Sequence, residues 1–145
     1  MSKSSLEYLK NIYILYKQNN FVRVTDLANT MNCSKPNVTK HLNILKENSL
    51  IEYEVYGKVS ITEKGIEIAK NLLEEEDVIY LLLKNVIGID NNHLRDDSSK
   101  IKNSISKDTY EELYKYVISK LGLNNLSCNF NIKNEKCRKC IIDRR

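Results

Sequence analysis

Short polar side chains and lysines are concentrated between residues 34 and 58 of this 145-residue chain. Asparagine, threonine and lysine are residue types that hydrogen-bond base edges and bind phosphates in the major groove of DNA. Asn37, Thr39 and Lys40 are predicted to lie near base edges, and Lys58 on the phosphate backbone. The full set of predicted nucleic-acid contacts is Ser34, Lys35, Pro36, Asn37, Thr39, Lys40, Asn43 and Lys58.

Two short helices joined by a tight turn are expected to present these side chains. The first is predicted near residues 25–31, and Ser34 is a suitable N-cap for the second. Pro36 falls in the first turn of the second helix, where backbone N–H groups make no hydrogen bond within the helix, so its missing N–H costs nothing. Three apolar residues recur there at i, i+4 and i+7, which predicts one buried face and leaves the polar residues outward: Val38, Leu42 and Leu45.

A hairpin is predicted directly after the second helix. Residues 51–56 and 59–62 alternate apolar and polar side chains around Gly57 and Lys58, a spacing typical of two short strands. Together with the two helices, this hairpin predicts a winged helix-turn-helix that binds double-stranded DNA. An alternative keeps the fold but makes the module bind another protein, without a DNA operator of its own.

Three cysteines near the C-terminus form a separate candidate site. Cys128, Cys137 and Cys140 have C-x8-C-x2-C spacing in a basic segment, and clustered thiols in a cytoplasmic chain favour a metal or redox role over disulfides. Three thiolates are one ligand short of a structural zinc site, which Cys33, His93 or a partner chain could complete. An iron–sulfur cluster, a thiol switch and free thiols in an irregular tail remain open alternatives.

The composition is that of a globular protein, with 41% hydrophobic and 29% charged residues. The sequence contains neither a run near the ~20 apolar residues of a membrane span nor an apolar signal core at its N-terminus. A cytoplasmic protein without membrane contact is therefore expected. The sequence also lacks a Gly-rich phosphate loop and a Ser/His/Asp set, and two histidines are few for acid–base chemistry, so an enzyme is not expected.

The net charge of +4 is unevenly distributed along the chain. Residues 1–60 carry eight Lys/Arg and five Asp/Glu, residues 61–121 carry nine and twelve, and the last 24 residues carry six and two. A basic N-terminal part next to an acidic middle suits a DNA-binding module attached to an acidic scaffold.

Helices account for most of the remaining sequence. One is predicted at residues 4–19, where Ser4 and Glu7 have the spacing of a capping box. A long helix at about residues 64–86 carries two apolar stripes, more than a small domain covers, so a homodimer contact is expected there. Two further helices are predicted, a short one held by Leu94, Ile101 and Ile105 and a last one between Ser106 and Gly122.

The predicted fold is mainly α, with two domains and a tail. Residues 1–63 form the N-terminal winged helix-turn-helix with its two-stranded wing. Residues 64–122 form a helical dimerisation domain, and residues 123–145 form a basic tail that contains the three clustered cysteines.

Several segments of the chain resemble the metal-dependent repressors of the diphtheria-toxin-repressor and manganese-transport-regulator type. The resemblance covers roughly residues 5–121 and is carried by YLKNIYILY, VRVTDLANTM, SKPNVTKHLNILKENSLIEYE, VSITEKG and LLLKNVIGID. It implies a sequence-specific transcription regulator of the shorter, two-domain form. Such proteins bind inverted-repeat operators as homodimers, and their second domain carries the dimer contact and the metal site.

The sequence departs from that family at the metal site. The resemblance places Glu7 at the first carboxylate of the site, Lys10 at the second, and Glu76 (or Asp77 with a one-residue shift) at the histidine. The family's remaining metal ligands are clustered on the helix after the long one, and the resemblance places them at Ser99, Lys102 and Asn103. Because hard divalent ions prefer oxygen and imidazole ligands, the two lysines predict that a site for manganese or ferrous iron is not retained here. Our hypothesis is that Lys10 instead pairs with Glu76.

Overall fold

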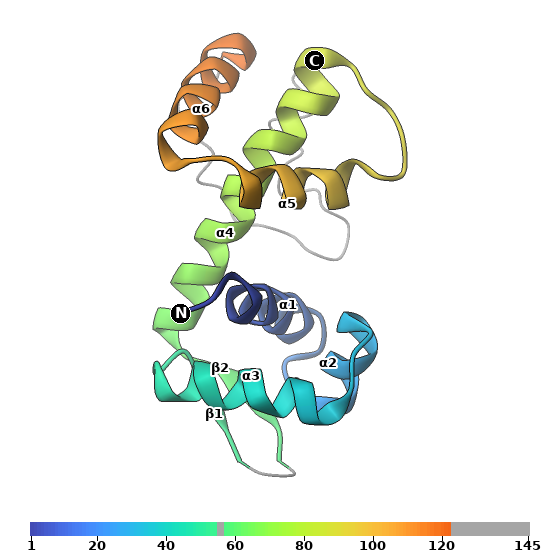
Figure 1. Ribbon diagram of the computed structural model, residues 1–145, viewed down its shortest axis with the longest axis vertical. Coiled ribbons are helices and arrows are strands. Elements are labelled where there is room, and N and C mark those ends of the chain that lie inside the picture. Colours follow the sequence, from blue (N-terminus) through green and yellow to red (C-terminus); the bar gives the residue numbers. More distant parts are fainter. Residues whose placement is uncertain (55–56, 123–145) are drawn as a thin grey trace. The chain divides into compact units, whose positions relative to one another are not determined.

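The computed structural model describes residues 1–54 and 57–122, whose elements are drawn in Figure 1. These residues form six α-helices, a π-helical segment and one two-stranded antiparallel sheet, which confirms the predicted mainly helical fold with a small wing. The chain forms two compact units, and the boundary between them lies within the fourth helix, between Asn71 and Leu72. No helix among the described residues is long and apolar enough to cross a membrane.

The first unit is a three-helix bundle followed by the wing. Its helices and strands are α1 (Lys3–Asn19), α2 (Val24–Met31), α3 (Lys35–Glu47), β1 (Ile51–Tyr53) and β2 (Val59–Ile61). Ser34 caps α3 as predicted, because its hydroxyl accepts from the backbone N–H of Asn37 at 3.3 Å. The core is made of fully buried aliphatic side chains from each helix and from the wing, among them Leu9, Ile12, Leu27, Val38, Leu42, Leu45 and Val59.

The wing is fastened to the bundle through its second strand. Ile51 pairs with Ile61 and Tyr53 with Val59, so that alternate residues of both strands are buried. Val59 also exchanges backbone hydrogen bonds with Val22, at 2.7 and 3.3 Å, in the segment between α1 and α2. This bridge brings the start of α2 next to the wing.

The fourth helix, α4 (Glu63–Leu81), begins immediately after the wing and requires a glycine in its first turn. The Gly65 N–H donates to the Thr62 hydroxyl at 3.1 Å, and that hydroxyl donates to the Ser49 carbonyl at 2.8 Å. A Cβ on Gly65 would overlap the Leu50 carbonyl oxygen and lie 2.8 Å from Cγ1 of Ile61. The first turn of α4 therefore packs directly against backbone.

The second unit is helical. It contains the end of α4, the π-helical segment η1 (Leu82–Ile87), α5 (Leu94–Ser104) and α6 (Lys107–Leu121). Its core joins α4 to α6 through fully buried Val78, Leu81 and Val117, surrounded by the half-buried side chains of Leu82, Tyr110, Tyr114, Ile118 and Leu121. As predicted, Ser106 caps α6 and Gly122 ends it with φ at 67°.

The structure differs from the sequence-based predictions in three local details. The N-cap of α1 is Ser2, whose hydroxyl accepts from the Ser5 N–H, so Ser4 is helical and the capping box is absent from that turn. The long helix changes to π geometry at Leu82. The sequence did not predict this change, because hydrophobic spacing does not distinguish an α-helix from a short π-helical segment. Leu94 is buried on α5 as predicted, but Ile101 is exposed, and Ser98 is the other buried residue of that helix.

Candidate functional site

The outer face of α3 is polar, as the sequence predicts. Val38, Leu42 and Leu45 are completely buried. The exposed residues of the helix and its cap include Ser34, Lys35, Pro36, Asn37, Lys40 and Asn43. The structure therefore brings all but one of the predicted contacts on α3 and its cap to the surface, and the exception, Thr39, is half-buried.

Several of these polar groups already have partners within the first unit. The Thr39 hydroxyl donates to the Lys35 carbonyl at 3.0 Å, one helical turn earlier. The side-chain amide of Asn37 donates from Nδ2 to the Tyr8 hydroxyl at 3.3 Å. Lys40 and Asn43 extend the exposed face along the next turn of α3.

A basic pocket adjoins this face. It has a volume of about 730 Å³ and is lined by Arg23, Val24, Thr25, Lys35, Thr39, Tyr53, Gly57 and Lys58. Three cations therefore border one cavity: Arg23 just before α2, Lys35 at the start of α3 and Lys58 just before β2. The positive end of the α2 helix dipole lies there as well. Such an arrangement favours the binding of an anionic group.

An aromatic ring supports two of these cations. Lys58 Nζ lies 4.5 Å from the ring centroid of Phe21, and Arg23 Cζ lies 5.2 Å from it. Sequence reasoning identified Lys58 but missed Arg23 and Phe21. A basic residue beside a helix start was the only available signal, because the Val22–Val59 bridge that brings the two segments together is a tertiary contact.

Helix α1 is fastened to α3 through a stacked ring pair. The rings of Tyr8 and His41 are 4.2 Å apart with an interplanar angle of 15°, and His41 Nδ1 lies 3.0 Å from the Ser5 hydroxyl. Burial, and then the nearby Lys40, lower the pKa of His41 below its usual value of 6.5. His41 is therefore neutral at pH 7 and serves packing rather than phosphate binding.

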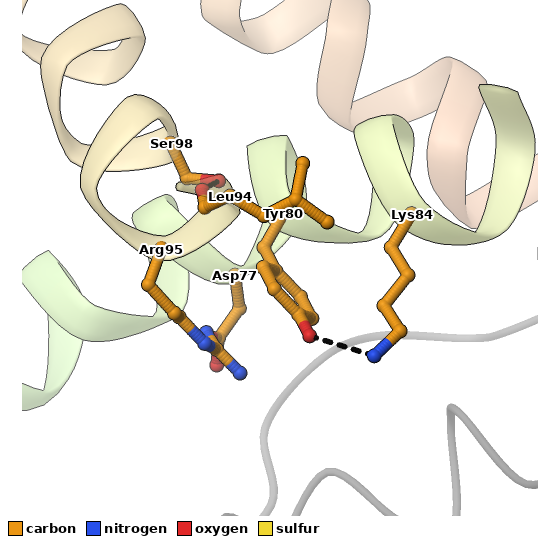
Figure 2. A network of polar contacts seen from close by, with 6 residues as sticks. All are labelled: Asp77, Tyr80, Lys84, Leu94, Arg95 and Ser98. Atoms are coloured by element: carbon orange, nitrogen blue, oxygen red, sulfur yellow. Dashed lines mark hydrogen bonds and ion pairs between the residues drawn. The ribbon is translucent and has the colours of Figure 1, made fainter. Parts of the chain in front are cut away.

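In the second unit, a buried carboxylate, that of Asp77, is paired with a cation of the same chain. Arg95 Nη1 lies 3.1 Å from Oδ1 of Asp77, a residue only 7% exposed, and Figure 2 shows the two side chains together beside Tyr80. The Arg95 guanidinium also lies 3.6 Å from the centroid of the Tyr80 ring. Lys84 donates to the Tyr80 hydroxyl at 3.1 Å, and this hydrogen bond raises the pKa of Lys84.

A second pair joins α4 to α5. Lys102 Nζ lies 3.1 Å from Oε2 of Glu75 and 5.0 Å from the ring centroid of Tyr110. Burial, together with Glu75 and other nearby acidic side chains, raises the pKa of Tyr110. The acidic side chains around Tyr110 thus create a negative potential, and Lys102 lies beside them as a compensating cation.

The residues at the family's metal positions fall on three helices. Glu7 and Lys10 are on α1, where Lys10 Nζ lies 2.9 Å from Glu7 Oε2. Glu76 is on α4, and α5 carries Ser99, Lys102 and Asn103. The pairing of Lys10 with Glu76 stays a prediction, because the two residues belong to different units.

This donor set does not fit a divalent ion. Ammonium groups, those of Lys10 and Lys102, occupy two of the positions, and hard divalent ions prefer oxygen and imidazole ligands. Lys10 is also within ion-pair distance of Glu7, the carboxylate at the first metal position. Within residues 1–54 and 57–122, no three His, Cys, Asp or Glu residues are grouped so that they could hold a metal ion. The clustered Cys128, Cys137 and Cys140 lie outside the described residues.

Comparison with known proteins agrees with both units. The family model for the N-terminal DNA-binding domain of iron-dependent repressors matches residues 1–59, and the model for their metal-binding and dimerisation domain matches residues 62–119. An uncharacterised HTH-type transcriptional regulator of Methanocaldococcus jannaschii is 32% identical over 78% of this chain and 91% of its own length. The HTH-type transcriptional regulator MntR of Shouchella clausii is 30% identical over 74% of each protein.

The fold is also found among solved structures. The crystal structure of IdeR from T. acidophilum aligns over 86% of this chain with a TM-score of 0.69 at 21% identity. This chain spans 56% of the length of that structure, so it matches about half of the longer protein. The matches to both domain models, the two regulators and the shared fold show that the chain belongs to the iron-dependent repressor family of DNA-binding transcription regulators.

Proposed function

We propose that the protein is a cytoplasmic repressor that binds an inverted-repeat operator as a homodimer. The observation that carries this proposal is the exposed polar face of α3 beside a pocket bordered by Arg23, Lys35 and Lys58. In this arrangement α3 enters the major groove, and the pocket receives a backbone phosphate next to the bases that α3 reads.

The proposed dimer matches the symmetry of such an operator. Residues 62–119, which include nearly all of the helices of the second unit, match the family's metal-binding and dimerisation domain. A two-fold dimer places its two recognition helices on successive half-sites, about one helical turn of DNA apart. Gel shifts on duplexes from the protein's own promoter region test this proposal. If the module instead binds another protein, no promoter duplex should bind more tightly than random DNA of equal length.

The replacement Lys58→Ala is expected to weaken binding to all DNA sequences to a similar extent. Lys58 borders the basic pocket and is supported by Phe21, so its loss removes one phosphate contact. The slope of log affinity against log salt should fall in magnitude by roughly one. Fluorescence anisotropy at several salt concentrations measures the slope. As a control, Lys100→Ala removes an exposed lysine of the second unit. An equal change in the salt slope for both variants would contradict the proposal that Lys58 contacts a DNA phosphate.

We also propose that DNA binding by this protein does not require a divalent metal. Lys10, Arg95 and Lys102 each lie within ion-pair distance of a carboxylate. These permanent cations neutralise negative charge that a bound ion would otherwise neutralise. A zinc or iron–sulfur site at the C-terminal cysteines is a separate proposal, tested by metal analysis of protein purified without oxygen.

A further inference from the structure

A tyrosine on α1 contacts an exposed side chain of α3, Asn37, which the proposed function places near DNA bases. The hydroxyl of Tyr8 accepts from Nδ2 of Asn37 at 3.3 Å and lies 3.1 Å from Sγ of Cys33. Tyr8 itself is 5% exposed, whereas Asn37 is exposed. A buried group of the supporting helix therefore holds one end of an exposed amide on the recognition helix.

The ring that carries this hydroxyl is fixed. Tyr8 stacks on His41, and His41 in turn contacts the Ser5 hydroxyl one turn before Tyr8 on α1. Burial, followed by the interaction with Cys33, raises the pKa of Tyr8 to about 12, so its hydroxyl keeps its proton at neutral pH. The hydroxyl can then donate to the Cys33 sulfur while it accepts from Asn37.

The backbone of Asn37 is held as well. Its N–H donates to the Ser34 hydroxyl that caps α3. An asparagine amide has two N–H donors and one acceptor oxygen. With one N–H given to Tyr8, the second N–H and Oδ1 remain, and these are the two groups with which asparagine binds the N7 and N6 positions of adenine.

We propose that Tyr8 is a positioning residue that orients the Asn37 amide so that it reads an adenine in the operator. This inference rests on the proposed function, since it requires that α3 enters the major groove. Tyr8 does not touch DNA in this account. It removes rotational freedom from Asn37 before binding, so the contact forms with less loss of side-chain entropy.

The test compares base preferences among four proteins: the native chain, Tyr8→Phe, Asn37→Ala and the double variant. Tyr8→Phe keeps the ring that stacks on His41 and removes only the hydroxyl. Each protein selects from a pool of randomised duplexes, and affinity is then measured for the best native duplex and for versions with one base pair changed.

We expect the native protein to prefer adenine at one position of each half-site. Asn37→Ala and Tyr8→Phe should each reduce that preference about tenfold, within the range of one base contact. The preference at every other position and the affinity for random DNA should be unchanged. The double variant should lose no more than Asn37→Ala alone, because Tyr8 affects the base preference only through Asn37.

A matched control separates orientation from simple loss of stability. Cys33→Ala removes the other partner of the Tyr8 hydroxyl but leaves the Asn37 bond in place, so it should keep the native base preference. Equal base preference in native protein and Tyr8→Phe overturns the inference, as does an additive loss in the double variant. If the native protein selects no sequence from the pool, the proposed function itself fails.

Discussion

Gly65→Ala is expected to destabilise the first unit by about 3 kcal/mol, the upper end of the usual cost of adding a methyl group to a packed site. The new Cβ would overlap the Leu50 carbonyl oxygen, and that oxygen belongs to backbone held between α3 and β1. A melting temperature lower by on the order of 10 °C follows from such a loss. Thermal unfolding followed by circular dichroism measures it.

The sign of this change is informative in itself. At an open helical position, alanine stabilises relative to glycine by about 1 kcal/mol. A gain in stability for Gly65→Ala would therefore show that the first turn of α4 is not packed on the Leu50 carbonyl. Lys64→Ala is the control, since this exposed neighbour on the same turn should change the stability by no more than about 0.5 kcal/mol.

Arg95→Met is expected to destabilise the second unit by about 2–3 kcal/mol, somewhat below the usual cost of breaking a buried ion pair. The Asp77 carboxylate is almost completely buried and would lose its guanidinium partner, and Tyr80 would lose the guanidinium over its ring. The cost is reduced because the Arg95 side chain is 33% exposed and partly screened by water. Urea unfolding at neutral pH measures the difference.

Two further variants show whether the loss comes from the stranded charge. Combining Arg95→Met with Asp77→Asn removes both charges and should recover part of the stability. Lys100→Ala breaks the exposed pair with Asp96 and should leave the stability almost unchanged, because water screens an exposed pair. If Arg95→Met costs no more than Lys100→Ala, the Arg95–Asp77 pair does not stabilise the unit.

The winged helix-turn-helix could be predicted because local signals agree over this region. Ser34 as an N-cap, Pro36 in the first turn and Val38, Leu42 and Leu45 on one face each identify α3 independently. The start of α1 was misplaced because Ser2, Ser4 and Ser5 are all plausible caps, and only the backbone shows that Ser2 has the extended conformation of a cap.

The partners of the site residues were harder to predict, because they depend on contacts between distant segments. Sequence spacing placed Asn37 outward correctly but did not reveal that its amide is held by Tyr8, which lies 29 residues earlier. Similarly, the lysines at the family's metal positions were recognised, but their carboxylate partners, Glu7 for Lys10 and Glu75 for Lys102, required the structure.

The most direct test of the account is operator affinity with and without a divalent metal. Native protein treated with a chelator is titrated onto its best selected duplex, and the titration is repeated with micromolar manganese and, without oxygen, with ferrous iron. We predict that the affinity changes by no more than about twofold, below the roughly 5–150-fold coupling typical of allosteric effectors. A tightening of about tenfold or more by either ion would show that the effector site is functional and would contradict the account.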